Sequence, residues 1–161
     1  MLDPAIAERI RAIFLHPEPY VTITEAARLL GWSRSEMDRA IRNGDIELTT
    51  TCSGPRFDIR ELAEKALDLW TLPVIETALG RDASLILPPT LRTRKLVLRL
   101  PEYQVQTLRI LAGDASESVD TLVDRMVAEL ADIHRERLAS LIAGLAEALA
   151  WPQQPITPQA H

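Results

Sequence analysis

Residues 92–101, Arg-Thr-Arg-Lys-Leu-Val-Leu-Arg-Leu-Pro, limit the fold of this chain more than any other stretch. After residue 94 the side chains alternate, with Lys95, Val97 and Arg99 on one side and Leu96, Leu98 and Leu100 on the other. Alternation with a period of two is typical of a half-buried β-strand. A lone strand in an otherwise helical chain cannot satisfy its own backbone groups, so it needs a partner. We therefore expect the strand 94–100 to pair with the same strand of a second copy, giving a homodimer with a cationic ribbon on its surface.

The charge of the whole chain restricts how it can meet nucleic acid. Its 161 residues suit one domain or two small ones, and they carry a formal net charge of −5. Such a balance argues against a protein that coats nucleic acid through overall positive charge. Any contact with DNA must therefore come from clustered cations on an acidic background.

Cysteine content and hydropathy predict a cytoplasmic protein. Cys52 is the only cysteine, so no disulfide can form within the chain and a reducing compartment is the default. The first residues include Asp3 and Glu8 and do not resemble a signal peptide. No apolar run is long enough to span a bilayer, so we expect no membrane partner. If the protein binds DNA, it is expected to associate with the nucleoid.

The N-terminal third reads as a series of capped helices. Asp3 followed by Pro4 opens the first helix. Thr22 with Glu25, and Ser33 with Glu36, are spaced as capping boxes that begin two further helices. A turn at Gly31 separates these two helices, and Gly44 ends the second. Two short helices joined by a tight turn predict a helix-turn-helix unit. The face of the second helix opposite Met37, Ala40 and Ile41 carries Ser33, Arg34, Ser35, Asp38, Arg39 and Arg42.

Several runs in this region resemble the excisionase/MerR-like winged helix-turn-helix family. They are TITEAARLLGWS at 22–33, AIRNGDI at 40–46, RFDI at 56–59 and EL at 61–62, and the resemblance covers about residues 20–70. It implies a recognition helix that enters the major groove and a β-hairpin wing over 46–59 that touches the DNA backbone or minor groove. The implied DNA-binding residues are Ser33, Arg34, Ser35, Arg39, Arg42 and, on the wing, Arg56. The wing departs from the family pattern, since it is short and rich in threonine.

Further helices follow the wing. Asp58 and Glu61 are spaced as a capping box and begin a helix that ends near Trp70. Residues 72–80, with Pro73 near the start and Gly80 at the end, predict a two-turn helix. We expect a first domain over 1–80, a connector over 81–91, a second domain over 92–151 and a disordered tail over 152–161.

The second domain resembles the ribbon–helix–helix family typified by the Arc repressor. After the strand, a helix starts at Pro101, Gly113 and Asp114 break it, and Ser118 begins a second helix. The apolar stripe of that helix is Leu122, Val123, Met126, Val127, Leu130 and Ile133. The resemblance covers about residues 92–133 and implies an antiparallel ribbon that lies in the major groove of double-stranded DNA. The implied DNA-binding residues are Arg94, Lys95, Val97, Arg99 and Ser118, and the implied dimerisation residues are Leu96, Leu98, Leu100, Leu122 and Met126.

Three functions remain open at this point, on a fold expected to be mainly α. The first is a homodimeric, sequence-specific DNA-binding protein that regulates transcription. The second is an antitoxin-like or plasmid-partition-like adaptor, which binds DNA with one module and a partner protein with the stripe at 138–151. The third is a dimeric scaffold that binds no nucleic acid. The sequence offers no metal-ligand spacing, no phosphate-binding glycine loop and no activated nucleophile, so we expect no enzyme, cofactor or metal.

Overall fold

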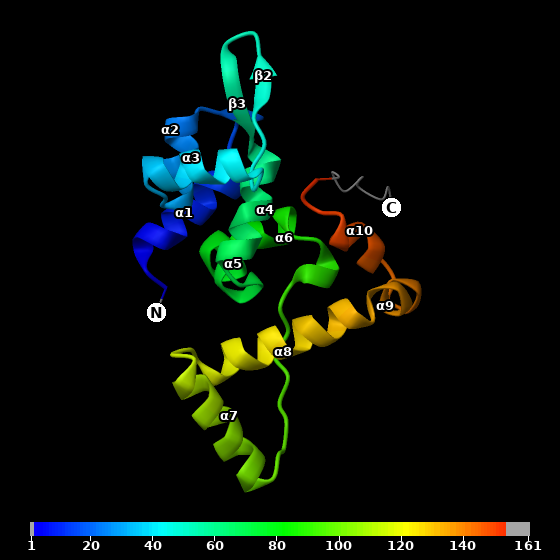
Figure 1. Ribbon diagram of the computed structural model, residues 1–161. Helices are drawn as coiled ribbons and strands as arrows, with labels where there is room; N and C mark the ends of the chain where they lie inside the picture. Colours follow the sequence, from blue (N-terminus) through cyan, green and yellow to red (C-terminus); the bar gives the residue numbers. More distant parts are fainter. Residues whose placement is uncertain (1, 154–161) are drawn as a thin grey trace. The chain divides into compact units, whose positions relative to one another are not determined.

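A computed structural model describes residues 2–153 of the chain, and these residues are mainly helical, as expected (Figure 1). They form two compact units. The first consists of Met1–Thr93 together with Glu147–His161, and the second is Arg94–Ala146. The expected division differs from this one in two places. Residues 81–91 belong to the first unit, because Ala83 and Leu87 are buried in its core. Residues 147–153 return to the first unit, whereas the expected tail at 154–161 lies outside the described residues.

The first unit begins with helices whose starts follow the predicted caps. Its elements to residue 69 are α1 (Pro4–Phe14), β1 (Tyr20–Val21), α2 (Ile23–Leu30), α3 (Arg34–Asn43), β2 (Thr49–Thr51), β3 (Gly54–Asp58) and α4 (Ile59–Leu69). The Asp3 carboxylate accepts a hydrogen bond from the Ala5 N–H at 2.9 Å. The Thr22 hydroxyl accepts one from the Glu25 N–H at 3.1 Å. These bonds satisfy donors that a helix start leaves without a partner.

A three-stranded antiparallel sheet has the order β1-β3-β2. Strand β2 pairs with β3 to form the expected hairpin, with Thr49 opposite Arg56. Strand β1, which pairs Val21 with Phe57, was not expected, because two residues are too short to show a periodicity. This pairing fixes the base of the hairpin to the chain that leads into α2.

The main core of the first unit lies between α1, α2, α3, α4 and the sheet. Ala26 and Ala27 pack in it with Met37 and Ala40, as expected, and all four are buried. Phe57 is fully buried at its centre. Because the alanines are small, α2 and α3 approach closely, so the sequence of α2 sets the position of α3.

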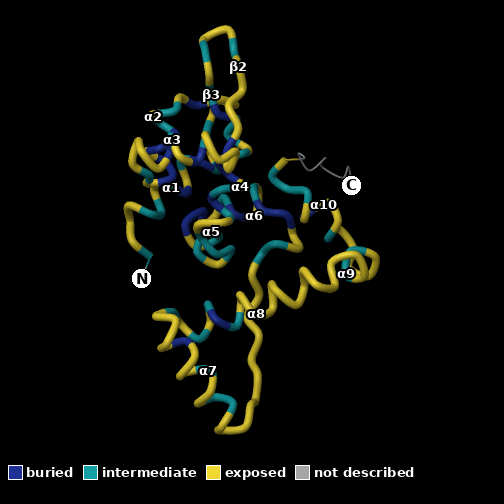
Figure 2. Tube along the Cα trace, in the orientation of Figure 1, coloured by how far each residue is buried: buried dark blue, intermediate teal, exposed yellow. Residues whose placement is uncertain are grey.

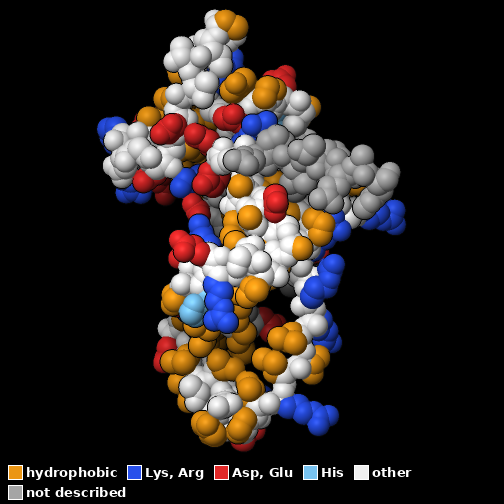
Figure 3. Space-filling model, turned by 90° about the vertical axis from the view of Figure 1, so that its right-hand side faces the viewer, with side chains coloured by type: hydrophobic (Ala, Val, Ile, Leu, Met, Phe, Trp, Pro, Cys, Tyr) orange, Lys and Arg blue, Asp and Glu red, His pale blue; other side chains and the backbone are white. Residues whose placement is uncertain are grey.

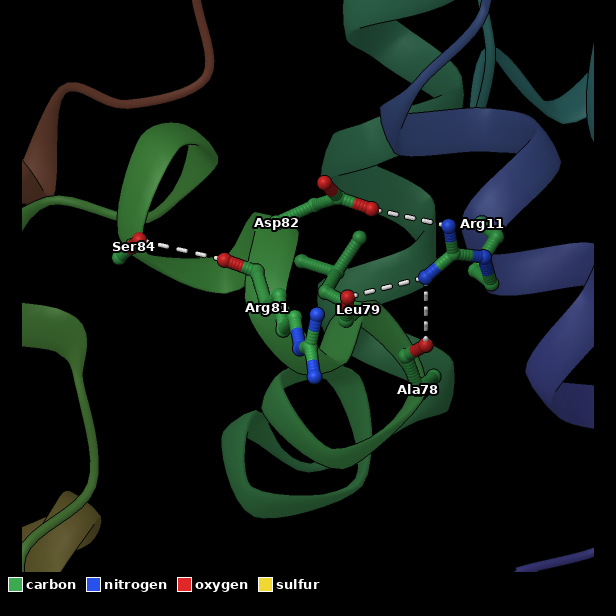
Figure 4. Close-up of polar contacts among 6 residues, drawn as sticks. All are labelled: Arg11, Ala78, Leu79, Arg81, Asp82 and Ser84. Atoms are coloured by element: carbon green, nitrogen blue, oxygen red, sulfur yellow. Dashed lines mark hydrogen bonds and ion pairs between the residues drawn. The ribbon is translucent and has the colours of Figure 1, made fainter.

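A second core lies between α1 and two helices that follow α4, which are α5 (Leu72–Leu79) and α6 (Ala83–Ile86). The short helices η1 (Gly80–Asp82) and η2 (Pro89–Leu91) precede and follow α6 in the chain. Ile10 of α1 is buried here with Ile75 and Leu79. Arg11 crosses from α1 to the end of α5, where it donates hydrogen bonds to the carbonyls of Ala78 and Leu79 and pairs with Asp82 at 2.8 Å (Figure 4).

The chain returns to the first unit near its end, through the last part of α10 (Leu145–Leu149). The ring of Trp151 stacks on Phe14 with 5.7 Å between their centroids. The Gln153 amide donates a hydrogen bond to the Glu64 carboxylate at 2.6 Å. Part of the stripe expected to bind a partner, 138–151, is therefore packed against the chain itself.

The second unit contains α7 (Glu102–Asp114), α8 (Val119–Ile133) and α9 (Arg135–Leu141). The Ser118 hydroxyl accepts a hydrogen bond from the Thr121 N–H at 3.1 Å and begins α8 as expected. The expected break at Gly113 was wrong by a few residues. Both Gly113 and Asp114 stay helical, and Ser116, with a φ of 55°, makes the turn.

The expected strand at 94–100 does not form within one chain. These residues have no regular secondary structure, because no other segment among the described residues pairs with them. Among residues 94–146 only Ala112 and Leu122 are buried apolar side chains, whereas the first unit has two buried cores (Figure 2). Figure 3 shows many hydrophobic side chains on the surface over this unit. The exposed ones are Leu96, Val97, Leu98, Leu100, Tyr103, Ile110, Leu111, Met126, Val127, Leu130, Ile133, Leu141 and Ile142.

Candidate nucleic-acid interface

Local contacts fix the start of α3. Gly31 takes a left-handed conformation with a φ of 73°, and the Trp32 N–H returns to the Ala27 carbonyl at 2.9 Å, which closes α2. The Ser33 hydroxyl and backbone N–H then form the expected capping box with Glu36. These hydrogen bonds hold the pKa of Glu36 below its ordinary value, and the bond from the Ser33 hydroxyl has the larger effect.

The two serines at this start are already occupied. The Ser33 hydroxyl lies 2.7 Å from the Glu36 carboxylate, and the Ser35 hydroxyl lies 3.0 Å from that of Ser33. Ser33 was expected to contact DNA, yet its hydroxyl serves the helix cap. A contact from Ser33 would have to replace the bond to Glu36.

The exposed face of α3 is cationic. Arg39 and Arg42 are exposed and form no ion pair with any described residue. Ser35, Arg39 and Arg42 follow at intervals of four and three residues, so they share one face of the helix. Arg34 lies in the first turn and pairs with Asp38 at 3.2 Å, so its charge is partly neutralised. Of the predicted arginines, Arg39 and Arg42 are thus the most available to a phosphate or a base.

The hairpin projects beyond the helices of the first unit (Figure 1). Its tip exposes Cys52 and Ser53, and the Thr51 hydroxyl donates a hydrogen bond to the Gly54 carbonyl at 2.8 Å. Arg56, the cation expected on the wing, is half-buried on β3. The exposed part of the hairpin is therefore mostly hydroxyl and backbone groups.

Glu61 of α4 holds the chain that enters the hairpin. The expected capping box with Asp58 was wrong: Asp58 accepts the Arg60 N–H at 2.8 Å, and the Glu61 carboxylate instead accepts the Glu47 N–H at 2.9 Å. Partial burial raises the pKa of Glu61, and the nearby Glu47, Asp58 and Glu64 raise it further, although the Glu47 N–H acts in the opposite sense.

The raised pKa of Glu61 predicts that a neutral side chain stabilises the fold at neutral pH. The folded state binds the Glu61 proton more tightly than the unfolded state does. Protonated Glu61 therefore stabilises the fold fully below about pH 4.5, and this contribution is lost as pH rises through the folded pKa. Glu61→Gln keeps an acceptor for the Glu47 N–H without the charge. We expect a gain of a few tenths of a kcal/mol at pH 7, or about 1–2 °C in Tm. Thermal unfolding at pH 7 and pH 4 measures it.

Glu8→Gln is the control, since it removes the same charge from an exposed position of α1. It should leave Tm unchanged within error. The advantage of Glu61→Gln should disappear at pH 4, and an equal gain at both pH values would show that ionisation of Glu61 is not its source.

A second set of cations lies in the second unit. Lys95, Val97 and Arg99 are exposed on the segment 94–100, and Arg94 is exposed beside them. At the start of α8 the Ser118 hydroxyl serves the helix cap, and Glu117 forms an ion pair with Arg125 at 2.7 Å. The ion pair offsets the negative charge of Glu117 next to Ser118, which was expected to contact DNA.

No metal-ligand group and no membrane helix is found among residues 2–153. Their histidine, cysteine and carboxylate side chains form no group of three that could hold a metal ion. None of their helices combines the length and the apolar character that crossing a membrane requires.

Comparison with known proteins adds no assignment. No family model, curated protein or solved structure gives a significant match to this chain.

Proposed function

We propose that this protein is a homodimeric, sequence-specific DNA-binding protein that regulates transcription. The observation that carries the proposal is the exposed face of α3, where Arg39 and Arg42 form no ion pair with residues 2–153, on a helix that the core of the first unit holds in place. Asp38 partly neutralises Arg34 and Glu36 lies close enough to Arg39 to feel its charge, but neither Arg39 nor Arg42 is held in an ion pair with a described residue. A major groove admits such a helix.

The hairpin adds a second element to the proposed interface. We infer that the first unit acts as a winged helix-turn-helix module of the excisionase/MerR type, with α3 as the recognition helix and β2–β3 as the wing. The exposed threonines and backbone groups of the wing suit hydrogen bonds to phosphates rather than a purely ionic contact. Cys52, the only cysteine, lies at the exposed tip. Its reaction with a thiol reagent should slow when DNA is bound.

The second unit supplies the proposed dimer. In the ribbon–helix–helix arrangement the segments 94–100 of two chains pair, and their leucines are covered together with α7 and α8. The exposed leucines at 96, 98 and 100 support this, because a single chain leaves them in water. Two recognition helices on one DNA would then gain affinity through effective concentration. Lys95 and Arg99 would lie on the outer face of the ribbon, where they can also contact the groove.

Arg39→Ala tests the recognition helix directly. The site is first obtained by genome-wide footprinting of the protein on its host DNA, and binding is then measured by fluorescence anisotropy. Because a groove contact from arginine is worth about 1–3 kcal/mol, we expect the Kd to rise about tenfold or more. The dependence of Kd on salt assigns the contact. If the slope of log Kd against log salt concentration falls by about one unit in the variant, Arg39 contacts a phosphate. If the slope is unchanged but the sequence specificity is relaxed, Arg39 contacts a base.

Arg81→Ala is the matched control, since Arg81 is exposed in η1 of the same unit and away from α3. It should leave Kd within twofold. Equal effects of the two substitutions would mean that the protein's overall charge, rather than α3, governs binding. Absence of binding even at low salt would favour the scaffold.

One observation favours the adaptor as a second candidate. Leu141, at the end of α9, is 68% exposed although the chain nearby returns to the first unit. The surface left for a partner protein is then 138–146 rather than the whole of 138–151. Co-purification of a partner that is lost in Leu141→Asp, with DNA binding intact, would support this function.

A further inference from the structure

A hollow of about 280 Å³ lies in the first unit beside α1, α4 and α6, and the returning chain forms part of its wall. Most of its lining side chains are apolar, and the stacked rings of Trp151 and Phe14 are among them. At its rim Leu85 is 83% exposed, an unusual position for a large apolar side chain. The lining residues are Ile13, Phe14, His16, Ile59, Arg60, Ala63, Leu85, Ile86, Trp151 and Pro152.

The charge of this wall is opposite to that of the chain. The lining includes Arg60 and His16 and no aspartate or glutamate, although the chain carries 23 acidic residues against 18 lysines and arginines. An anionic ligand would therefore meet the Arg60 cation and no carboxylate in the lining itself, although the Glu25 carboxylate lies 3.8 Å from the His16 ring.

Arg60 is available because its natural partners are occupied. Glu64, one helical turn along α4, is placed to pair with it, but the Glu64 carboxylate binds the Gln153 amide at 2.6 Å. The Asp58 carboxylate accepts the Arg60 backbone N–H as the cap of α4. Arg60 forms no ion pair with any described residue and stands in the first turn of α4, where the helix dipole disfavours a cation. A bound anion would offset this unfavourable placement.

We propose that this hollow binds a small amphipathic carboxylate, whose apolar body, about the size of one aromatic ring, packs on Trp151 and Leu85 and whose carboxylate pairs with Arg60. The volume suits a ligand at the small end of those that proteins bind in pockets. Because the guanidinium presents paired N–H groups, it matches the two oxygens of a carboxylate. The site goes beyond the proposed function and does not depend on it.

The test uses phenylacetate as the probe and the full chain without DNA. Binding is followed by NMR through the indole N–H resonance of Trp151, which Trp151→Phe identifies. We expect a saturable shift with phenylacetate and a Kd at least tenfold weaker for phenylacetamide, its uncharged analogue. Arg60→Gln should raise the Kd for phenylacetate at least tenfold. Arg81→Gln removes the same charge at another place and should change this Kd less than twofold. Leu85→Ala should weaken the binding of phenylacetate and of phenylacetamide by the same factor, and because Leu85 is exposed, the substitution should not disturb the fold.

Three results would overturn the site. The first is no shift with phenylacetate up to its solubility limit. The second is equal affinity for the acid and the amide. The third is an unchanged Kd in Arg60→Gln. If that variant instead weakened only DNA binding, Arg60 would serve the nucleic acid and not a small ligand.

Discussion

Leu98→Lys is expected to leave the protein monomeric at micromolar concentration, if it forms the proposed dimer. Leu98 is 57% exposed in the single chain, and the proposed pairing of two segments 94–100 would cover it. Burying a leucine side chain contributes about 1.5–3 kcal/mol, and a twofold-symmetric interface carries each position twice. Loss of the two Leu98 side chains therefore weakens dimerisation by about 3–6 kcal/mol, which raises the dissociation constant roughly a hundredfold to ten-thousandfold. Buried lysine charges add to the penalty. Sedimentation equilibrium measures the change.

Val97→Lys is the matched control. It introduces the same side chain one residue earlier, at a position that is 76% exposed in the single chain. In a strand, neighbouring side chains point to opposite faces, so residue 97 would lie on the outside of the proposed ribbon and its substitution should leave the proposed dimer intact. If both variants dissociated, or neither did, the alternating strand would not be the dimer interface.

Gly31→Ala is expected to destabilise the first unit by about 1.5–3 kcal/mol. The left-handed conformation, with its φ of 73°, costs a residue with a Cβ about 1–2 kcal/mol. In addition, a Cβ at this position would overlap the Nη1 atom of Arg9. The guanidinium lies 5.8 Å from the centroid of the Trp70 ring and would have to leave it, which costs about 0.5–1 kcal/mol more. Urea denaturation measures the change in the free energy of unfolding.

Gly44→Ala separates these two contributions. Gly44 ends α3 with a φ of 75°, nearly the same as that of Gly31, but no atom lies within 4 Å of a Cβ built there. It should show the conformational cost alone. In the Arg9→Ala background the extra cost of Gly31→Ala should vanish, because the obstructing side chain is gone. A cost at Gly31 no larger than that at Gly44 would contradict the role given to Arg9.

Local sequence signals determined the positions of most helices in this chain. Asp3, Thr22, Ser33 and Ser118 begin helices in the structure as their types predict, because a capping bond joins residues only two or three apart. Gly31 and Gly44 end helices for the same reason, since a left-handed backbone is a property of one residue. The cationic face of α3 also followed from spacing alone. The DNA-binding roles of its residues stay predictions.

Only the tertiary structure decided which hydrogen-bond partner each carboxylate takes, and which charged side chains keep no partner among the described residues. Glu61 could have closed a capping box with Asp58, but the fold brings the Glu47 N–H to it across the hairpin. Glu64 could have paired with Arg60, but Gln153 from the far end of the chain takes its carboxylate. The spacing of residues along the sequence shows which nearby partners a side chain could reach. The choice among them depends on distant segments that share the same space, and for this reason the hollow beside Arg60 had no signal in the sequence. The segment 94–100 differs from both, since the sequence predicts a strand there and no other segment within residues 2–153 pairs with it.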